Sequence, residues 1–250
     1  MKRYLLMISL ALNVLMAGLL FWVNMRYGLL GKAQRVWLQE KRMPGFAPRH
    51  ELNRNYQVRR ELFRMDRNQA ARVLFLGDSH VALVDWTSLL GAPLVANRGI
   101  EGDTTAGVLA RLSDEAGFSG DTAILWIGTN DVLRGESAER IAGRVSRIVE
   151  ELFRAHASRI TVVVLAVAPV ARWVENGRIR NRTVTETNQR LASAAGKEGY
   201  RFISTEDLLT DEAGFLRGDM TSDGVHLSAM AYSGIVALLR PALETPPVAR

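Results

Sequence analysis

Hydrophobic and polar positions alternate along residues 72–241 in a pattern that predicts buried strands separated by helices. Short apolar runs occur at five places, which are Val73–Leu76, Leu94–Ala96, Ala123–Ile127, Ile160–Ala166 and Tyr200–Ile203. Runs of this length that are apolar throughout are typical of strands covered on both faces. Because the stretches between them have helical periodicity, we expect a three-layer α/β/α domain around a parallel sheet of five strands.

Three of the intervening helices have recognisable ends. The clearest spans Ser137–His156, with apolar residues on one face and its first serine as the N-cap. A second is expected over Thr185–Ala195, where Gly196 ends it. A third is expected over Ser228–Leu239, where Pro241 stops it because proline cannot donate a helical hydrogen bond.

The N-terminal segment Tyr4–Val23 is almost entirely apolar. A transmembrane helix needs roughly 20 such residues, so this segment is long enough to span a bilayer. A cleaved signal peptide has a shorter apolar core and a small-x-small cleavage site, whereas this segment ends near the bulky pair Phe21 and Trp22. We therefore expect residues 1–25 to form an uncleaved, single-pass transmembrane anchor, with a signal peptide as the alternative.

Residues 26–71 are expected to be a basic juxtamembrane connector. Residues 24–72 hold twelve Lys and Arg against four acidic residues, whereas residues 73–250 hold 18 against 22. The net charge of +6 is therefore concentrated beside the apolar segment, which indicates a membrane surface and not nucleic acid as the partner. The connector is expected to contain a surface helix over Glu51–Ala71. Its candidate packing points are Tyr56, Leu62, Phe63 and Met65.

A serine, a histidine and an aspartate stand where a nucleophilic hydrolase needs them. Ser79 directly follows a predicted strand, and a serine hydroxyl becomes a good nucleophile only beside a base. His226, in a Gly-containing loop before the last helix, is the candidate base, and Asp223 is placed to orient its ring. His80 adjoins the serine and is poorly placed to accept its proton. Taken alone, these residues also have ordinary explanations as a helix cap, a turn residue and a surface residue.

Two further turns supply candidate hydrogen-bond donors. One contains Gly102, whose backbone N–H can be approached closely, and the other contains Asn130, whose side chain offers an NH₂ group. Such donors suit an oxyanion hole, although each turn alone also fits ordinary turn chemistry. Because Ser79, Gly102 and Asn130 each follow a predicted strand, a parallel sheet would bring all three to its carboxyl edge, where ligands bind.

Together, the four segments resemble the motif blocks of the SGNH hydrolases in the GDSL lipase/esterase superfamily. The blocks are Gly77-Asp78-Ser79-His80, Gly99-Ile100-Glu101-Gly102-Asp103-Thr104, Gly128-Thr129-Asn130-Asp131 and Asp223-Gly224-Val225-His226. The resemblance extends from about Val73 to Leu239, and residues 97–105 are most similar to the platelet-activating-factor acetylhydrolase-like branch. One departure is His80 where the family name has Leu, and this residue is expected to alter the rim of the pocket.

The resemblance implies a role for each matching residue. It makes Ser79 the nucleophile, His226 the base and Asp223 the acid that orients the base. It also implies an oxyanion hole formed by the N–H groups of Ser79 and Gly102 and by the Asn130 side chain. No cofactor or metal is expected, since the chain has no cysteine and no cluster with metal-ligand spacing.

We therefore expect a flavodoxin-like SGNH hydrolase domain over residues 72–241, followed by a flexible tail at 242–250. The expected activity is hydrolysis of an acyl or acetyl ester of a small molecule, lipid or glycan through an acyl-enzyme. The alternatives are acyl transfer or polysaccharide O-deacetylation in envelope assembly, and a non-enzymatic binding module on the same fold. The oligomeric state stays open. Loop arginines at 178, 180 and 182 either contact an anionic substrate or are solvated, and solvation is the preferred explanation.

The charges that flank the anchor conflict over its orientation. Lys2 and Arg3 favour an N-terminus inside the cell, but Lys and Arg are more numerous on the other flank. A strict count would therefore place the C-terminal body in the cytoplasm. An anchored hydrolase is expected outside, and we expect the catalytic domain to be periplasmic or otherwise extracytoplasmic.

Overall fold

The computed structural model describes residues 54–66, 71–91, 95–115, 117–156, 159–176 and 181–244. The chain divides into two compact units, Met1–Arg49 and His50–Arg250, and all described residues belong to the second. The expected anchor at 1–25 lies outside the described residues. Across the ranges that the structure describes, we find no helix with the length and apolar character needed to cross a membrane.

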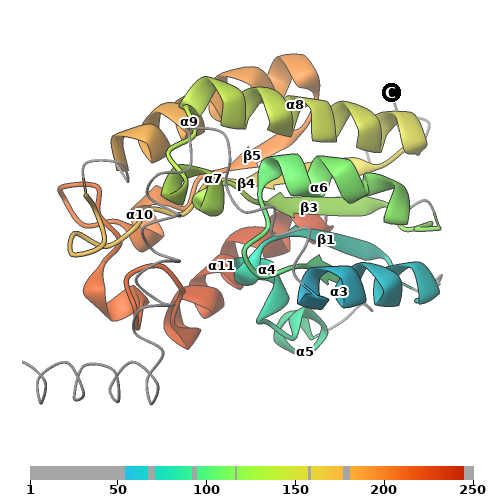
Figure 1. The fold of residues 1–250 in the computed structure, drawn as a ribbon, viewed down its shortest axis with the longest axis horizontal. Coiled ribbons are helices and arrows are strands. Elements are labelled where there is room, and N and C mark those ends of the chain that lie inside the picture. Colours follow the sequence, from blue (N-terminus) through green and yellow to red (C-terminus); the bar gives the residue numbers. More distant parts are fainter. Residues whose placement is uncertain are drawn as a thin grey trace, which may run out of the picture. The chain divides into compact units, whose positions relative to one another are not determined.

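A parallel sheet of five strands forms the centre of the molecule (Figure 1). Its strands are β1 (Val73–Gly77), β2 (Val95–Gly99), β3 (Thr122–Trp126), β4 (Thr161–Leu165) and β5 (Arg201–Ile203). Their order is β2-β1-β3-β4-β5, and each adjacent pair is parallel. The predicted sheet is confirmed. The second strand extends further than its apolar run. This strand, β2, lies at the edge of the sheet and continues through the polar residues Asn97 and Arg98.

Helices cover both faces of the sheet. The α-helices are α3 (Arg54–Met65), α4 (Ser79–Ala82), α5 (Trp86–Leu90), α6 (Thr105–Arg111), α7 (Thr129–Leu133), α8 (Ala138–Ala155), α9 (Asn181–Glu198), α10 (Glu206–Leu209) and α11 (Ala229–Glu244). Two 3₁₀ turns, η2 (Leu112–Glu115) and η3 (Gly218–Met220), complete the described elements. In Figure 1, α6, α8 and α9 lie on one side of the sheet, while α5 and α11 lie on the other. The three-layer α/β/α architecture is thus confirmed.

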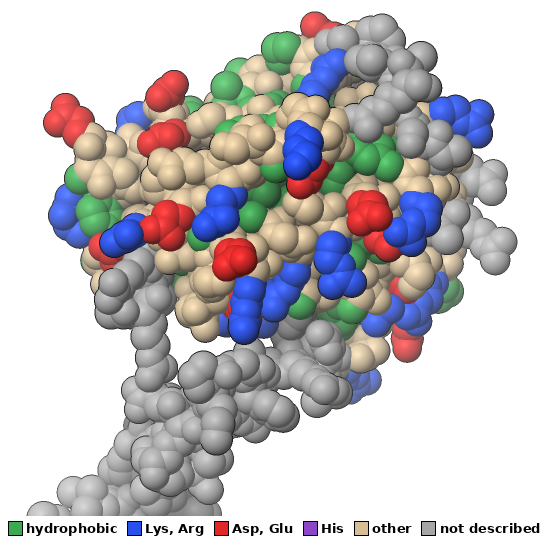
Figure 2. All heavy atoms as spheres, turned by 90° about the horizontal axis from the view of Figure 1, so that it is seen from above, with side chains coloured by type: hydrophobic (Ala, Val, Ile, Leu, Met, Phe, Trp, Pro, Cys, Tyr) green, Lys and Arg blue, Asp and Glu red, His purple; other side chains and the backbone are tan. Residues whose placement is uncertain are grey.

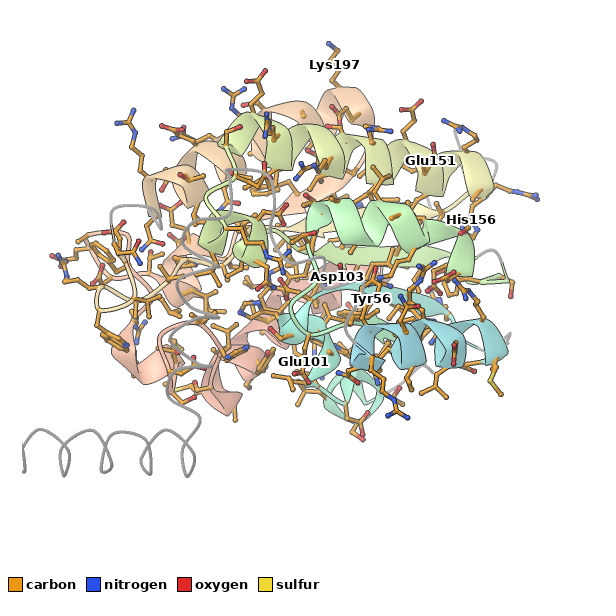
Figure 3. The ribbon with its side chains drawn as sticks, viewed as in Figure 1. Tyr56, Glu101, Asp103, Glu151, His156 and Lys197 are labelled. Atoms are coloured by element: carbon orange, nitrogen blue, oxygen red, sulfur yellow. The ribbon has the colours of Figure 1, made fainter. Side chains whose placement is uncertain are left out.

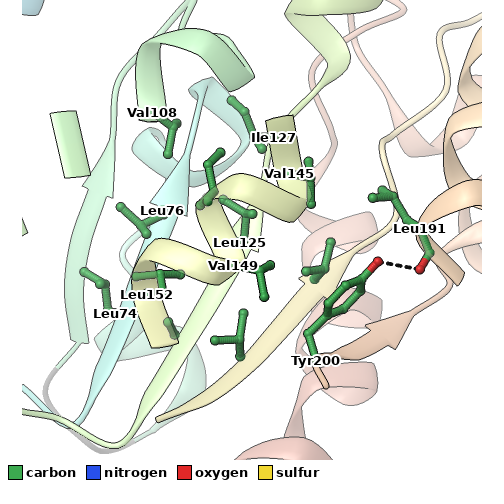
Figure 4. Packing of buried hydrophobic residues seen from close by; sticks show 14 of the residues in the cluster. Leu74, Leu76, Val108, Leu125, Ile127, Val145, Val149, Leu152, Leu191 and Tyr200 are labelled. Atoms are coloured by element: carbon green, nitrogen blue, oxygen red, sulfur yellow. Dashed lines mark hydrogen bonds between the residues drawn. The ribbon is translucent and has the colours of Figure 1, made fainter. Parts of the chain in front are cut away.

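Alternate residues of each central strand face opposite layers. In β1, Leu74 and Leu76 belong to the core beneath α8, while Val73 and Phe75 belong to the core beneath α11. Figure 4 shows the first of these cores. Burying one such large apolar side chain contributes about 1.5–3 kcal/mol, so these two cores are the main source of stability.

The outward faces of α8 and α9 are polar. On α8, Arg154 pairs with Glu150 at 3.5 Å, and on α9, Arg182 pairs with Glu186 at 2.8 Å. Figure 2 shows acidic and basic side chains interspersed on the face above these helices. These exposed pairs are worth little individually, but they mark the solvent side of helices whose other side is apolar.

The end of α9 is set by a different glycine from the predicted one. Gly196 lies inside the helix, which continues to Glu198. Gly199, with φ of 79°, ends it in the left-handed conformation that glycine adopts without strain. The next residue, Tyr200, donates a hydrogen bond to the Leu191 carbonyl at 2.5 Å (Figure 4).

Pro241 does not stop α11, contrary to the prediction. The helix continues to Glu244, so residues 242–244, expected in the tail, are helical. Proline removes a helical hydrogen bond, but Leu239 and Ala242 on either side of it are buried at 0% and 8% exposure. Packing of this last turn against the sheet therefore outweighs the local effect of the proline.

Helix α3 precedes β1 and packs within the same compact unit. Of the four predicted packing points, Tyr56 and Phe63 are buried, whereas Leu62 and Met65 are exposed. The Tyr56 hydroxyl donates to the Gly107 carbonyl of α6 at 3.4 Å. Part of the expected connector therefore packs directly on the α/β layers.

Candidate active site

Four chain segments meet at the carboxyl edge of the sheet. In the strand register, Gly77 at the end of β1 lies between Gly99 at the end of β2 and Trp126 at the end of β3. The turns after these strands and a loop before α11 enclose a cleft of about 340 Å³. Its lining residues are Ser79, His80, Glu101, Gly102, Thr129, Asn130, Leu133, Asp223, Val225 and His226.

Ser79 is the first residue of α4, in a turn that depends on close backbone approach. A Cβ on Gly77 would lie 2.1 Å from the Trp126 carbonyl oxygen, and one on Gly99 would lie 2.3 Å from the Ala82 nitrogen. Real Cβ atoms do not come this close, so glycine at both positions lets β1, β2 and α4 pack together. The Ser79 side chain is thereby held at the edge of the sheet, with the residue 7% exposed.

The loop before α11 brings a histidine to this serine. The Ser79 hydroxyl and the His226 Nε2 lie 3.0 Å apart, and the His226 Nδ1 lies 2.6 Å from an Asp223 carboxylate oxygen. The Thr221 hydroxyl donates to the His226 carbonyl at 2.6 Å and accepts from the Gly224 N–H at 2.9 Å. The structure thus brings the three predicted triad residues into one hydrogen-bonded chain.

Asp223 is held as a carboxylate. Desolvation raises its pKa, but the opposing hydrogen bonds from the His226 ring and from the Val225 and His226 N–H groups lower the pKa to about 2. An ionised Asp223 can only accept a hydrogen bond, so Nδ1 of His226 carries a proton toward it. The Nε2 atom is then free to accept the proton of the Ser79 hydroxyl.

The predicted oxyanion donors border the same cleft. The Asn130 side chain donates to Asp78 Oδ2 at 3.2 Å, which uses one of its two N–H bonds and leaves the second. Gly102 has φ of 75°, a left-handed conformation that favours glycine, and its carbonyl accepts from Arg134 at 2.9 Å. Ser79, Gly102 and Asn130 therefore lie around one cleft, as the sequence predicted.

Buried ionic groups support the turn that carries Gly102. Asp103 and Arg111 form an ion pair at 2.8 Å with both side chains 0% exposed. Arg111 also donates to the Arg98 carbonyl at 2.8 Å, and Arg59 of α3 donates to the Gly99 carbonyl at 3.0 Å. Figure 3 labels Asp103 in this turn and Tyr56 in the neighbouring α3. The role of these side chains could not be predicted from the sequence, because the positions of arginines along a chain do not show which of them will be buried.

Asp131, the last residue of its motif block, ties the Asn130 turn to α6. It is fully buried and accepts from the Thr105 N–H at 2.9 Å and the Thr105 hydroxyl at 2.5 Å. Burial raises the pKa of Asp131, while the Thr105 hydrogen bonds and the charge of Arg144 oppose this shift. The carboxylate thus links the second and third motif blocks, a role that the sequence did not disclose.

His80 and the loop arginines lie in different environments. His80 was expected to alter the pocket rim; it is one of the residues that line the cleft, but it is buried there, at only 2% exposure. Arg182 belongs to α9, and its side chain is 82% exposed and paired with Glu186, which agrees with solvation. The arginines at 178 and 180 lie outside the described residues. Within the described parts of the chain, no group of three or more metal-ligating side chains is present.

Comparisons with known sequences identify the relatives of this chain. A model of the GDSL-like Lipase/Acylhydrolase family matches residues 75–233. The platelet-activating factor acetylhydrolase IB subunit alpha2 of Gallus gallus is 31% identical over 175 residues, which cover 65% of this chain and 72% of that protein. The alpha1 subunit of Bos taurus is 28% identical over 183 residues, covering 71% of this chain and 77% of that protein.

Solved structures show the same fold. A protein of Streptococcus pneumonia, described as a candidate platelet activating factor, superimposes with a TM-score of 0.72 at 26% identity, covering 84% of this chain and 99% of that chain. A GDSL-like lipase from Bacteroides thetaiotaomicron gives a TM-score of 0.64 at 22% identity, covering 74% and 97%. Since the family model spans well over half of the sequence, the chain belongs to the GDSL-like lipase/acylhydrolase family and is a hydrolase that acts on ester bonds.

Proposed function

We propose that the protein hydrolyses esters through a covalent acyl-enzyme on Ser79. The observation that carries this proposal is the hydrogen-bonded chain from the Ser79 hydroxyl to His226 at 3.0 Å and from His226 to Asp223 at 2.6 Å. A serine hydroxyl with an adjacent, oriented base is the arrangement that nucleophilic catalysis requires.

The reaction proceeds in two halves. As the Ser79 oxygen attacks the ester carbonyl, its proton passes to His226 Nε2, and Asp223 stabilises the imidazolium that forms. The tetrahedral intermediate collapses when His226 returns this proton to the leaving alkoxide, which departs as the alcohol. Water then enters, gives a proton to His226 and attacks the acyl group, and the free acid leaves as Ser79 regains its proton.

The negative charge that develops on the carbonyl oxygen needs donors fixed in advance. In the proposal, the N–H groups of Ser79 and Gly102 and the second N–H of the Asn130 amide supply them. Loss of one such donor typically costs about 2.7–4 kcal/mol in the barrier. The Asp78 carboxylate holds the Asn130 amide at 3.2 Å, so little reorganisation is needed when the charge develops.

We propose that the acyl group is short, as in an acetyl ester of a lipid or glycan alcohol. Two observations support this substrate class. The curated relatives are named as platelet-activating factor acetylhydrolase subunits, and the cleft above Ser79 is small, at about 340 Å³. A panel of p-nitrophenyl esters tests it: kcat/KM should be highest for acetate and fall as the acyl chain lengthens, and a maximum at a long chain would contradict it.

Replacing the nucleophile tests the mechanism. Ser79→Ala should lower kcat on p-nitrophenyl acetate by about 10⁵–10⁶-fold while the thermal midpoint stays near that of the wild type. A fluorophosphonate probe should label the wild type and not the variant. Ser88→Ala is the matched control, because Ser88 is a serine of α5 that is not among the cleft residues and whose hydroxyl donates to the N-cap residue Asp85 at 2.6 Å. Full turnover by purified Ser79→Ala would refute the mechanism.

We further propose that Tyr4–Val23 anchors the enzyme in a membrane with the catalytic domain on the extracytoplasmic side. The length and apolar character of this segment and the basic residues beside it support the anchoring. Lys2 and Arg3, which precede it, favour an N-terminus inside the cell and therefore a catalytic domain outside. Alkaline phosphatase fused at the C-terminus should be active, whereas green fluorescent protein fused there should not fluoresce after Sec-dependent export. The opposite pair of results would place the domain in the cytoplasm.

A further inference from the structure

His80 connects two segments of the active site that are far apart in the sequence. Its Nδ1 lies 3.1 Å from Asp78 Oδ1, in the turn that carries the nucleophile. Its Nε2 lies 3.0 Å from the carbonyl oxygen of Val225, the residue that precedes His226. The His80 backbone N–H donates to the same Asp78 oxygen at 3.0 Å. A leucine at position 80, as in the family name, could make neither of the two ring contacts.

The partners of the His80 ring determine which of its nitrogens carry protons. The Val225 carbonyl can only accept, so Nε2 must donate to it. Asp78 accepts hydrogen bonds at both oxygens, from the His80 N–H and from Asn130, as an ionised carboxylate does. A bare Nδ1 would direct its lone pair at that carboxylate, whereas a protonated Nδ1 donates to it. The geometry therefore fits an imidazolium paired with a buried carboxylate.

The surrounding charges act in the same direction. Burial lowers the pKa of His80, but the charge and hydrogen bond of Asp78, the Val225 carbonyl and the more distant charge of Asp223 outweigh it and raise the pKa above 6.5. From the loop before α11, the His226 ring faces His80 with its centroid 6.1 Å away.

From α11, the Tyr232 hydroxyl donates to the His80 carbonyl at 3.1 Å. Burial and the charge of Asp78 raise the pKa of Tyr232, so this phenol is neutral at working pH. The β3 strand contributes the uncharged Trp126 ring, with its centroid 5.2 Å from that of His80. Asp78 is therefore the charged group in direct contact with the His80 ring.

We propose that His80, as an imidazolium, is a positioning residue that ties the His226 loop to the nucleophile turn. The proposal rests on the proposed reaction at Ser79. By donating to the Val225 carbonyl, His80 holds the neighbouring His226 at hydrogen-bond distance from the serine. By donating to Asp78, it also supports the carboxylate that orients Asn130. One buried side chain thus sets the position of the base and, through Asp78, of an oxyanion donor.

Three substitutions separate the two ring contacts. His80→Leu fills much of the volume and removes both, His80→Gln keeps a donor near the Nε2 position, and His80→Asn keeps one near the Nδ1 position. His80→Leu should lower kcat on p-nitrophenyl acetate by about 10–100-fold with KM changed by less than about 2-fold, because misplacement of a catalytic group by about 1 Å costs this much. His80→Gln should recover most of the lost kcat, and His80→Asn should recover less.

Each alternative result contradicts the proposal. A wild-type kcat in His80→Leu would show that the hydrogen bonds from His80 are not needed for turnover. Equal losses of kcat in the Leu and Gln variants would indicate that His80 contributes by packing alone. A change in KM with unchanged kcat would make His80 a substrate contact. Thermal midpoints measured in parallel identify a variant that fails to fold. If His80→Leu does not fold, the kcat of His80→Gln and NMR of the His80 ring nitrogens in the wild type test the proposal instead.

Two measurements on the full chain do not depend on turnover. Nitrogen-15 NMR of the wild-type His80 ring, assigned by comparison with His80→Gln, should show both ring nitrogens protonated at pH 7; one bare nitrogen would overturn the proposal. Amide hydrogen exchange in residues 221–227 should be faster in His80→Leu than in the wild type and near wild type in His80→Gln. If these results hold while the wild type neither cleaves esters nor reacts with fluorophosphonate, the proposed function fails and the tie stands.

The ionic pair also predicts a pH dependence of stability. Because the pKa of His80 is raised in the folded state, its contribution is fully present below its ordinary value of about 6.5 and is lost as pH rises through the higher folded value. The excess of the wild-type thermal midpoint over that of His80→Gln should therefore shrink as pH increases from 6 to 9. A difference that grows over this range would contradict a protonated His80.

Discussion

The two sides of the active-site cleft are built differently. On the oxyanion side, the Asp103 and Arg111 side chains that support the Gly102 turn are both 0% exposed. On the base side, the paired side chains of His226 and Asp223 are 40% and 50% exposed. The groups that hold the oxyanion donors therefore belong to the folded core, whereas the base lies on a surface loop held by hydrogen bonds.

This difference separates stability from activity. A buried ion pair away from the reacting atoms affects catalysis through the stability of the fold. Removing one partner lowers that stability, because it leaves an uncompensated charge in the interior. An exposed catalytic pair can be broken at little cost to folding, since water solvates the groups left behind. Substitutions of the exposed catalytic pair should therefore lower activity with little loss of thermal stability. Substitutions of the buried ion pair should lower thermal stability first.

In the comparison of the two sides, the largest expected effect is that of Asp223→Asn on turnover. The amide of the substituted side chain would donate to His226 Nδ1 and leave the proton on Nε2, where it faces Ser79 and blocks its deprotonation. We expect kcat to fall by about 10³–10⁴-fold. The thermal midpoint at pH 7 should change little, because Asp223 is half exposed. Steady-state kinetics and a thermal melt of the same sample check this, and a large stability loss would contradict the comparison.

The pH profile sharpens this prediction. The pKa of Asp223 is lowered to about 2, so its contribution to stability is present above its ordinary value of 3.8 and is lost only as pH falls through about 2. Asp223 thus stays ionised between pH 4 and 9, and it should not produce the acidic limb of the activity profile. A kcat/KM profile over this range, in wild type and Asp223→Asn, tests the point.

The next largest effect is expected for Asp103→Ala, now on stability. Removing this carboxylate leaves Arg111 buried without its ionic partner, which typically costs about 3–5 kcal/mol. Urea denaturation should show a matching loss in the free energy of unfolding. The double variant Asp103→Leu/Arg111→Met removes both charges and should recover part of the loss. Stability of the single variant within about 1 kcal/mol of the wild type would show that the pair matters little.

The smallest effect is expected for Arg59→Ala. Arg59 donates from α3 to the Gly99 carbonyl at 3.0 Å, near the start of the turn that carries Gly102. A single hydrogen bond to a charged donor is worth about 1.5–3 kcal/mol when buried, and less at this half-buried position. We expect kcat to fall by about 2–10-fold. Arg54→Ala, an exposed arginine of the same helix, is the matched control, and an equal loss there would indicate a general charge effect.

Local patterns were sufficient for much of the fold. Apolar runs predicted all five strands, because a parallel strand covered on both faces has no polar side to interrupt it. The prediction was weakest where tertiary packing overrode local rules. Gly196 lies within α9 and Pro241 within α11, since the burial of neighbouring residues outweighs their helix-breaking tendency.

The motif blocks were equally visible in the sequence, and the family that they resemble is the family to which the chain belongs. The blocks name chemical groups in short segments, so residue type and spacing suffice to find them. The individual roles of Ser79, Asp223 and His226 stay predictions, and the Ser79 and Asp223 variants above test them. Membrane anchoring also stays a prediction, because the segment Tyr4–Val23 lies outside the described residues.

The sequence by itself determined the succession of strands and helices along the chain and the chemical groups at the ends of the strands, because these depend on residues that are neighbours in the chain. Only the tertiary structure decided that Ser79 and His226, 147 residues apart, meet at 3.0 Å. It alone revealed that His80 is buried between Asp78 and the Val225 carbonyl. Such contacts join distant segments, and they form only when the packing of the sheet and its helices brings those segments to one edge.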